Sequence, residues 1–374
     1  MIVAIADDIT GAAEIGGIGL RYGLRVLITD GTADFSKKDL VVFYTNTRSM
    51  PEAEAVKQME SLTAKARALQ PSLFYKKIDS VLRGHVLAET EAQMEVLRLN
   101  KALIVPANPA LGRTISGGHY HVNGQHIHHT GFFADPEFPV RSSAVKDMLR
   151  SESVKVISKH DFLERGISVG EAESVEDVEA WARCVNKSIF LAGSGSFFAA
   201  LLANEQSGLY KKAAVNLSLP LLLISGTTYE KSRERRKAFR HLVSYMPSTL
   251  LRKSDANTNE VEKWAADTIA ILIKHGKAII AIGENENGEA NAEQLREKLS
   301  DAVNLVLQKN GVRELLIEGG STAFAVLQKA GFSSFMPTEE LRQGVVRMQV
   351  EGQPHLHLTI KPGSYDWPEE WSFN

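Results

Sequence analysis

Cysteine is almost absent from this sequence, and so are long apolar runs. Cys184 is the one cysteine among 374 residues, so no disulfide can form within the chain, and a reducing compartment is expected. No apolar run approaches the ~18 residues that a membrane-spanning helix needs. The first residues lack the basic region and long apolar core of a signal peptide. The composition therefore predicts a protein of the cytoplasm.

The sequence also lacks an excess of charge of either sign. Its 43 Lys and Arg residues nearly balance 45 Asp and Glu residues, for a formal net charge of −2. Nucleic-acid-binding domains are expected to show a basic surface, and clusters of basic residues draw proteins to anionic membranes. We therefore expect neither nucleic acid nor a membrane among the partners of this protein.

Two common nucleotide-binding motifs are missing as well. The C-terminal half has no Gly-x-x-x-x-Gly-Lys-Ser/Thr motif, which argues against a P-loop enzyme. No Gly-x-Gly-x-x-Gly follows the first apolar run with an acidic residue about twenty positions later. An NAD(P)-dependent enzyme is therefore the weaker alternative, although the fold class described next permits one.

Short apolar runs alternate with amphipathic segments, a pattern that favours an α/β fold with mostly parallel sheets. A chain of this length exceeds one ordinary core, so two domains are expected. The alternation restarts at Leu221–Ser225, which places the boundary between a first domain, 1–217, and a second domain, 218–374. Each domain is expected to be a mostly parallel sheet flanked by helices. Residues 107–150 are expected to be irregular, because they are rich in Gly, His, Pro and Asn.

The expected elements can be given by residue number. In the first domain we expect strands at 2–6, 25–29, 40–45, 73–78, 102–105 and 188–192, and helices at 11–22, 51–69, 86–99 and 197–203. In the second domain we expect strands at 221–225, 278–282, 314–317, 345–350 and 356–360, the last two as an antiparallel pair, and helices at 229–242, 261–275, 292–308 and 322–330.

An acidic loop follows the first expected strand. Asp7 and Asp8 come directly after Ile2–Ala6, and Thr10 and Gly11 open a helix. Ligands of open α/β sheets gather at the carboxyl ends of strands, and the first N–H groups of a helix favour anions. This pair of carboxylates could bind hydroxyls, accept a proton or hold a cation. The alternative interpretation is that Asp8 or Thr10 caps the helix.

A second polar cluster follows the expected strand at 73–78. It contains Lys77, Asp79, Ser80 and Arg83, and Arg48 follows a third strand. Lys and Arg can neutralise a carboxylate or a phosphoryl group, and Asp can take a proton from a hydroxyl. The alternative is a solvated ion pair beside a helix cap. Three such strand ends would converge at one sheet edge and would suit a polyhydroxy carboxylate.

Two glycine-containing turns in the second half join a strand to a helix. They are Ser225-Gly226-Thr227-Thr228 and Glu318-Gly319-Gly320-Ser321-Thr322. Glycine lets the backbone approach phosphates closely, and a helix N-terminus supplies donors without a lysine. Each turn taken alone is also a common strand-to-helix connection.

Other patterns favour simpler interpretations. His119, His121, His126, His128 and His129 lie close together in the sequence, which raises a zinc hypothesis. No cysteine lies nearby, so contact with substrate or solvent is the preferred interpretation and no metal site is expected. The segment 193–196, Gly-Ser-Gly-Ser, lacks a convincing Asp and His partner set for hydrolase chemistry.

The ordered motifs of this chain resemble those of the four-carbon acid sugar kinases, which phosphorylate erythronate- or threonate-like acids with ATP. The resemblance extends over nearly the whole chain. It rests on the following segments: Ala6-Asp7-Asp8-Ile9-Thr10-Gly11-Ala12; Lys76-Lys77-Ile78-Asp79-Ser80 with Leu82-Arg83-Gly84; and Pro106-Ala107-Asn108-Pro109 with Gly112-Arg113-Thr114, Tyr120, Val122-Asn123-Gly124 and Asp135-Pro136.

The resemblance implies a substrate domain, a nucleotide domain and an active site in the cleft between them, with ATP and Mg²⁺ as cofactors. It implies that the acid sugar is bound by Asp8, Arg48, Lys77, Ile78, Asp79 and Ser80, and the local chemistry adds Arg83. It implies that ATP is contacted by Ser225, Glu318, Gly319, Gly320, Ser321 and Gly363. Asp8 or Asp79 would orient the acceptor hydroxyl and accept its proton, with Asp8 preferred.

The nucleotide half departs from the family pattern. The family usually has Gly-Gly-Asp-Thr where this chain has Gly319-Gly320-Ser321-Thr322. A non-catalytic ligand-binding or regulatory member of the family is therefore an alternative to a sugar-acid kinase of the cytoplasm. The sequence leaves open whether the chain assembles as a homodimer.

Overall fold

The computed structural model describes residues 1–134, 138–205, 217–227, 229–252, 258–283, 290–309, 311–363 and 365–368. The chain forms two compact units, Met1–Tyr210 and Lys211–Asn374. The expected boundary between residues 217 and 218 stays a prediction. None of the helices in the described part of the chain combines the length and the apolar character that crossing a membrane requires.

The first unit is built on a parallel sheet. Its strand order is β2-β3-β1-β4-β11-β5-β10-β9, and each neighbouring pair runs parallel. The strands are β1 (Ile2–Ala6), β2 (Val26–Thr29), β3 (Leu40–Tyr44), β4 (Leu73–Lys77), β5 (Lys101–Val105), β9 (Lys155–Ile157), β10 (Gly166–Gly170) and β11 (Phe190–Gly193). Sequence reasoning missed β9, which has only three residues, and β10, which has glycine at both ends.

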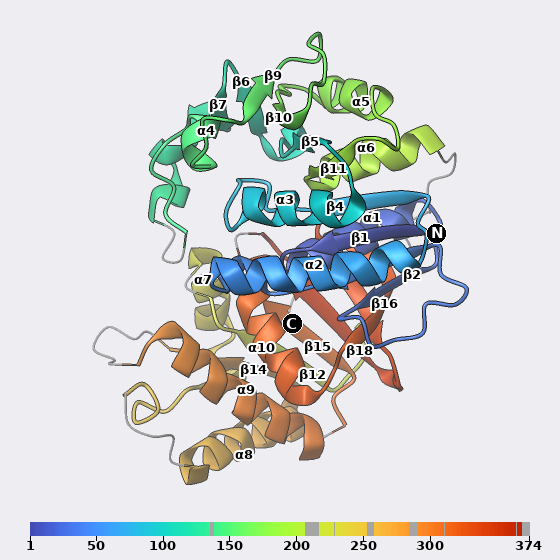
Figure 1. The fold of residues 1–374 in the computed structure, drawn as a ribbon. Coiled ribbons are helices and arrows are strands. Elements are labelled where there is room, and N and C mark those ends of the chain that lie inside the picture. The colour runs from blue at the N-terminus through green and yellow to red at the C-terminus, as the bar shows by residue number, and fades with distance from the viewer. Residues whose placement is uncertain are drawn as a thin grey trace. The chain divides into compact units, whose positions relative to one another are not determined.

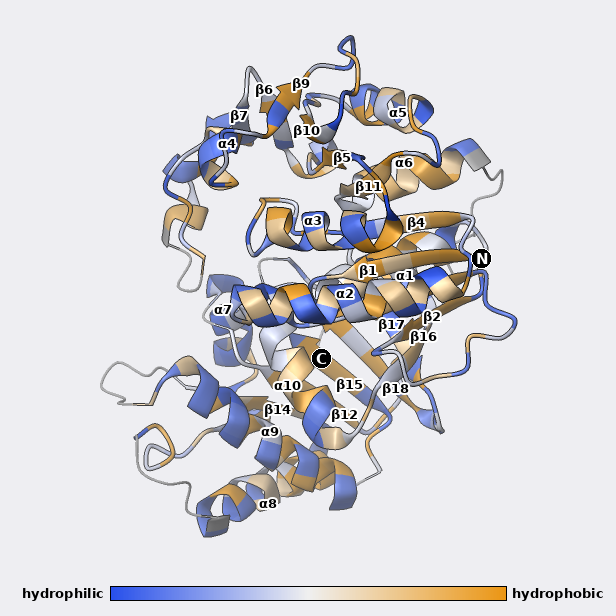
Figure 2. Ribbon diagram, in the orientation of Figure 1, coloured by the Kyte–Doolittle hydropathy of each residue, from blue (hydrophilic) through white to orange (hydrophobic). Residues whose placement is uncertain are grey.

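Helices pack on this sheet in two groups. They are α1 (Ile9–Arg21), α2 (Glu52–Ala68), α3 (Val86–Leu97), α4 (Val145–Met148), α5 (Val175–Arg183) and α6 (Gly195–Glu205). In one group α2 and α3 lie side by side (Figure 1), and in the other α6 contacts both α1 and α5. Val3 and Ile5 of β1 pack against Met59 and Leu62 of α2, and Figure 2 shows β1 as hydrophobic along most of its length. A strand that is apolar on both faces is typical of a parallel sheet covered by helices.

A small antiparallel sheet replaces the irregular structure that we expected over residues 107–150. It consists of β6 (Arg113–Ser116), β7 (His119–Val122) and β8 (Gln125–His126), paired in that order. Asn123 and Gly124 join β7 to β8 with φ of 51° and 77°. Asn-Gly is the pair that favours a type I′ hairpin turn, so the sequence did contain a signal for this sheet.

The second unit has a mixed sheet of order β13-β14-β12-β15-β18-β17-β16. The first five strands run parallel, and β16–β17 and β17–β18 are antiparallel, which confirms the expected antiparallel pair. The strands are β12 (Leu221–Ser225), β13 (Val243–Tyr245), β14 (Lys277–Ala281), β15 (Glu314–Glu318), β16 (Ser334–Arg342), β17 (Val345–Val350) and β18 (Gln353–Lys361).

The helices of the second unit are α7 (Glu230–Ala238), α8 (Thr258–His275), α9 (Ala292–Lys309) and α10 (Gly320–Ala330). In α9, Leu295, Leu299, Ala302, Val303 and Val306 are buried, as their shared helical face predicts. Together the two sheets and their helices confirm the predicted α/β class.

Strand register positions the polar loops of the first unit. Ala6 of β1 pairs with Tyr44 of β3 on one side and with Lys77 of β4 on the other. The loops that follow these three strands therefore begin at the same level of the sheet, and their side chains meet at its carboxyl edge.

Candidate functional site

Asp8 is the first residue of the site, and it is the N-cap of α1. It has extended backbone angles, φ −148° and ψ 165°, and its Oδ1 accepts a hydrogen bond from Gly11 N at 2.7 Å. Its Oδ2 accepts from Thr10 Oγ1 at 2.6 Å. A Cβ at Gly11 would lie 2.9 Å from Asp8 Oδ1 and 3.2 Å from Lys77 Cγ. Capping therefore explains the position of Asp8, and glycine lets Lys77 approach it.

Arg48 joins the three carboxylates of the site. Its Nε and Nη2 donate to the two oxygens of Asp7 at 3.0 and 2.7 Å. Its Nη1 donates to Asp8 Oδ2 at 3.0 Å and lies 3.8 Å from Asp79 Oδ1. The Arg48 side chain is 12% exposed. Since buried carboxylates are costly unless paired, this guanidinium stabilises the whole acidic group.

The electrostatics of Asp7 and Asp8 differ. Burial raises the pKa of Asp7, and Arg48 offsets that effect only in part. Burial also acts to raise the pKa of Asp8, but the charges of Arg48 and Lys77 and the bonds from Thr10 and Gly11 outweigh it and lower this pKa. Asp8 therefore holds its negative charge more firmly than Asp7 does.

Lys77 points back into the first unit. Its Nζ donates to the carbonyl of Ile78 at 2.9 Å and lies 3.2 Å from Glu14 Oε2. Sequence reasoning missed Glu14, which lies on α1 and is 8% exposed. Glu14 is the one charged residue between Ile9 and Leu20. A lone charge on a helix of small and apolar residues was the signal for a buried partner.

Asp79 lies in a tight loop with Arg83. Arg83 donates from Nε to Asp79 Oδ2 at 2.7 Å, from Nη2 to Oδ1 at 3.0 Å, and from its backbone N at 3.2 Å. Although burial opposes this, Arg83 and Arg48 hold the pKa of Asp79 far below its usual range. Gly84, at φ 88°, closes the loop, and a Cβ there would lie 3.0 Å from Arg48 Cγ.

The small antiparallel sheet forms one wall of the site. Arg113 Nη1 on β6 donates to Ser80 Oγ, and Tyr120 on β7 donates from its hydroxyl to the Ser80 carbonyl at 2.5 Å. The guanidinium carbons of Arg83 and Arg113 each lie 5.7 Å from the centre of the Phe132 ring. Sequence reasoning assigned no site role to Arg113 or Tyr120, although both fall in the motifs that carry the family resemblance.

The five histidines gather on and after this small sheet. The rings of His121 and His126 are 4.7 Å apart, and those of His128 and His129 are 4.0 Å apart. Among the residues that the structure describes, no group of three or more His, Cys, Asp or Glu side chains is arranged to hold a metal ion. The geometry therefore gives the zinc hypothesis no support.

Glu318 is the centre of a polar network in the second unit. Its Oε2 accepts from Ser225 Oγ at 2.6 Å, and its Oε1 accepts from Ser232 Oγ at 3.0 Å and Trp367 Nε1 at 2.8 Å. Arg236 Nη1 donates to the same Ser225 Oγ at 2.7 Å. This network ties the turn after β12 to the turn after β15.

Glycines allow these two turns to touch. Gly319 caps α10 with a φ of 94°, and Gly319, Gly320 and Ser321 are half-buried. A Cβ at Gly226 would lie 2.5 Å from Thr322 Oγ1. The first N–H groups of α10 are therefore presented next to the turn that follows Ser225, an arrangement that suits an anion.

Lys361 supports the segment that contains Gly363. Its Nζ donates to the carbonyls of Pro362, Gly363 and Tyr365 at 3.1, 3.3 and 2.7 Å. Burial lowers the pKa of Lys361 to about 8, although Glu318 lies 3.9 Å away and acts to raise it. Beside it is a cavity of about 240 Å³ whose lining includes four cationic side chains, Lys231, Arg235, Arg342 and Lys361, and one carboxylate, Asp366, which pairs with Lys231.

The structure brings the expected residues of each unit together. Asp8, Arg48, Lys77, Asp79, Ser80 and Arg83 converge at the carboxyl edge of the first sheet, while the Ile78 side chain lies in the core and only its carbonyl takes part. In the second unit, Ser225 and Glu318 end β12 and β15, Gly319, Gly320 and Ser321 lie at the start of α10, and Gly363 follows β18. The roles of these residues, and the shared cleft, stay predictions.

Two domain families match this chain. Residues 2–201 match the family described as the sugar-binding N-terminal domain, and residues 222–365 match the family described as the nucleotide-binding C-terminal domain. The two matches together extend over most of the sequence, and each falls within one of the two compact units.

Several relatives are similar over nearly their full length. A D-threonate kinase of Salmonella typhimurium is 26% identical, over 91% of this chain and 89% of the relative. A D-erythronate kinase of Heliobacterium modesticaldum is 25% identical, over 91% and 88%. A 3-oxo-tetronate kinase of Cupriavidus necator is 24% identical, over 99% and 95%.

Solved structures share the fold. A Salmonella typhimurium LT2 protein described as a tRNA synthase matches with a TM-score of 0.80 at 19% identity, over 98% of this chain and 96% of that chain. A Haemophilus influenzae protein matches with a TM-score of 0.72 at 20% identity, over 97% of each chain. At these identities the likeness shows the fold alone.

Proposed function

We propose that this chain, which belongs to the four-carbon acid sugar kinase family, is an ATP-dependent phosphotransferase whose acceptor is a hydroxyl of a four-carbon sugar acid. Its relatives are named for threonate, erythronate and 3-oxo-tetronate, and its substrate is of the same class. The observation that carries this proposal is the convergence of Arg48 and Arg83 on Asp8 and Asp79 at one sheet edge, where the charge of Lys77 also acts on Asp8.

The acid is held by the more accessible cations of the site. Arg48 already donates to both oxygens of Asp7 and to Asp8, so it acts mainly to position these carboxylates. Arg83 also binds both oxygens of Asp79, but its side chain is 23% exposed, against 12% for Arg48, and it stacks on Phe132 beside Arg113. A pair of guanidinium groups in this position suits a carboxylate, which they can bind with paired hydrogen bonds.

Asp8 is the group that orients the acceptor hydroxyl. Both oxygens of Asp79 are bound by Arg83, and its pKa is held far below the usual range. Asp7 has a raised pKa, but Arg48 binds both of its oxygens. Both oxygens of Asp8 also accept hydrogen bonds, from Gly11, Thr10 and Arg48, but Asp8 lies nearer the surface than Asp7, at 9% against 3% exposure. Its lowered pKa makes it a weak base, which is sufficient because phosphoryl transfer depends mainly on positioning and charge neutralisation.

The transfer is a single in-line displacement. The acceptor oxygen forms a bond to the γ-phosphorus of ATP, the bond from that phosphorus to the bridging oxygen breaks, and ADP leaves. The hydroxyl proton passes to Asp8. The cations of the first unit neutralise charge on the acid and on the transferred group.

ATP is bound by the second unit. The N-terminus of α10 and the cationic cavity beside Lys361 both suit phosphates, and Lys361 holds the Gly363 segment in place. Glu318 has both oxygens engaged within its own unit. Ser321 offers a hydroxyl oxygen where the resemblance leads one to expect a carboxylate. Mg²⁺, when bound with the phosphates of ATP, would supply neutralisation of their charge.

The test is an assay of ADP release with a panel of four-carbon acids, with mass spectrometry of the product. D-threonate, D-erythronate and 3-oxo-tetronate are the first members of the panel, and the Asp8→Ala variant sets the background. We expect a monophosphorylated acid from at least one of them. No product above the Asp8→Ala background with any acid would overturn the proposal.

A non-catalytic member of the family is the second candidate, because Ser321 stands in place of a carboxylate. Thermal shift separates the two. A kinase is stabilised both by the acid and by MgATP, whereas a binding protein responds to the acid alone. Location in the cytoplasm and assembly as a homodimer stay predictions, which fractionation and analytical ultracentrifugation test.

A further inference from the structure

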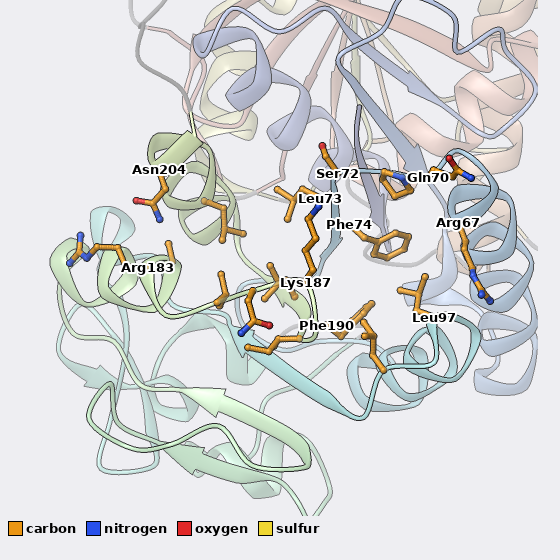
Figure 3. A pocket seen from close by; sticks show the side chains of 18 residues that line it. Arg67, Gln70, Ser72, Leu73, Phe74, Leu97, Arg183, Lys187, Phe190 and Asn204 are labelled. Atoms are coloured by element: carbon orange, nitrogen blue, oxygen red, sulfur yellow. The ribbon is translucent and has the colours of Figure 1, made fainter.

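A large pocket lies at the opposite edge of the first sheet from the acid site. Figure 3 shows it at the amino ends of the strands, and its volume is about 860 Å³. Leu73 and Phe74 at the start of β4 line it, as does Phe190 at the start of β11. Strand β4 thus has this pocket at one end and Lys77 of the acid site at the other. Four residue steps of a strand, roughly 13 Å, separate the two ends.

The wall of the pocket is apolar and partly exposed. Leu73, Phe74, Leu97, Leu99 and Val185 line it, and each is half-buried. Apolar side chains that stay accessible in a concave site favour an apolar ligand, since covering them removes that surface from water. The volume lies within the range of about 300–1,000 Å³ that is typical of small-molecule sites.

The charged side chains of the pocket are all cationic. Arg67, Arg183 and Lys187 line it, and among the described lining residues no side chain carries a carboxylate. Figure 3 shows Arg67 and Arg183 at the two ends of the pocket, with Lys187 extending between them toward Leu73. This distribution favours an anion.

The three cations differ in how far they are already engaged. Arg67 Nη1 donates to the carbonyl of Val96 at 2.9 Å, and Arg183 lies 3.7 Å from Glu179 on the exposed side of α5. Lys187 has no hydrogen-bond or ion-pair partner in the part of the chain that the structure describes. Within the described residues, its amine can therefore pair with a ligand without breaking an existing contact.

We propose that this pocket is a second ligand site, which binds an amphipathic carboxylate: the apolar chain lies against Phe74 and Leu99, and the carboxylate pairs with Lys187. The acid sugar of the proposed reaction has no apolar part and does not suit this site. The site does not depend on the proposed kinase activity, and its test uses no kinase assay.

The test is isothermal titration of the full-length protein with decanoate at low ionic strength. We expect one molecule to bind per chain. Decanol keeps the apolar chain without the charge, and butyrate keeps the charge without most of the chain, so each should bind at least about tenfold more weakly, a difference of about 1.4 kcal/mol. Added NaCl should weaken decanoate binding, because exposed charge pairs are screened.

Two variants probe the two halves of the site. Lys187→Glu reverses the charge at Lys187, and Val185→Asp places a carboxylate in the apolar wall; each should weaken decanoate binding about tenfold. Lys57→Glu is the matched control, because Lys57 is an exposed lysine of the same unit outside the pocket, and it should leave binding unchanged.

Several outcomes would overturn this site. They are equal binding of decanoate and decanol, equal binding to wild type and Lys187→Glu, uptake of many decanoate molecules per chain, and displacement of decanoate by a four-carbon acid. Absence of any decanoate binding would overturn it as well. Since phosphorylation is measured separately, failure here leaves the proposed kinase activity intact.

Discussion

Arg48 and Asp7 form a bidentate ion pair, with Nε and Nη2 of the arginine 3.0 and 2.7 Å from the two carboxylate oxygens. The pair joins the loop after β1 to the loop after β3. The third nitrogen of the same guanidinium, Nη1, binds Asp8. The geometry of Arg48 therefore sets the position of Asp8, the residue that we propose orients the substrate.

Arg48→Lys should therefore impair catalysis while keeping the charge. Lysine cannot reproduce the planar fork that binds both oxygens of Asp7 and reaches Asp8. We expect kcat/KM to fall about 100-fold, the scale of effect that a misplaced catalytic group produces. The free energy of unfolding should fall by about 3 kcal/mol, because a buried pair is disrupted. Steady-state kinetics and urea unfolding measure the two effects.

Arg25→Lys is the control for Arg48→Lys. Arg25 also binds both oxygens of an aspartate, Asp39, but this pair is exposed. Exposed pairs contribute less than about 1 kcal/mol, so both stability and kcat/KM should stay close to wild type. Wild-type kinetics in Arg48→Lys would contradict the positioning role of Arg48.

Asp8→Asn separates capping from catalysis. Asparagine is as good an N-cap as aspartate, so it can still accept the bond from Gly11 and keep the start of α1. It cannot hold the negative charge or take the proton, and kcat should fall by about 100-fold or more. A rapid-quench or coupled ADP assay measures this change.

Two further variants calibrate the capping effect. Asp8→Ala should be less stable than Asp8→Asn by about 1 kcal/mol, because the cap is lost as well. Ser174→Ala removes the cap of α5, where Ser174 accepts from Asp177 N at 3.2 Å, and should cost a similar free energy without affecting kcat. If Asp8→Asn retained full activity, Asp8 would be a structural residue only.

Glu318→Gln should raise the KM for ATP about tenfold or more, with the acid KM little changed. The carboxylate accepts hydrogen bonds from Ser225, Ser232 and Trp367, and an amide can accept them only through one of its two polar atoms. The turns that we propose bind ATP would then shift relative to each other. Each 1.4 kcal/mol of binding free energy lost in this way weakens the affinity for ATP tenfold.

Glu314→Gln is the matched control, because it changes a buried glutamate at the other end of the same strand. Glu314 pairs with Arg347 at 2.5 and 3.2 Å. We expect Glu314→Gln to lower stability but to leave the KM for ATP unchanged. Equal effects of the two variants on this KM would show that Glu318 acts only through the stability of β15.

The lowered pKa of Lys361 predicts that the free energy of unfolding rises with pH above 8. Burial lowers its pKa in the folded protein to about 8 from an ordinary value of 10.5. Between these values the unfolded chain binds a proton that the folded chain has released, so the free energy of unfolding increases with pH. This gain in the free energy of unfolding is complete above about pH 10.5 and is lost as the pH falls toward 8. From pH 8 to pH 10 it amounts to about 2 kcal/mol.

Comparison of wild type with Lys361→Met isolates this contribution. Urea unfolding followed by tryptophan fluorescence should give a difference in free energy of unfolding that changes with pH between 8 and 10 and is constant between 6 and 7. Curves for the two proteins that stay parallel across the whole range would contradict the lowered pKa of Lys361.

The sequence by itself determined the α/β class and most strand ends of the first unit. Apolar runs such as Ile2–Ala6 are strands because both of their faces are covered, and Asp8, Lys77 and Asp79 follow or end such runs. Since parallel strands bring their carboxyl ends to one edge, convergence of these residues could be expected before any contact was known. The charged residue Glu14 and the turn pair Asn123-Gly124 were equally visible, although their meaning was missed.

Only the tertiary structure decided which partner each charge takes. Arg48 and Asp7 are 41 residues apart, and Arg113 and Ser80 are 33 apart; strand register and the packing of the small antiparallel sheet bring them together. The same holds for the pocket at the opposite edge, whose walls come from the ends of several separate elements. Local patterns report what each segment prefers, whereas ion pairs and cavities depend on distances between segments, and those distances are set when the chain packs.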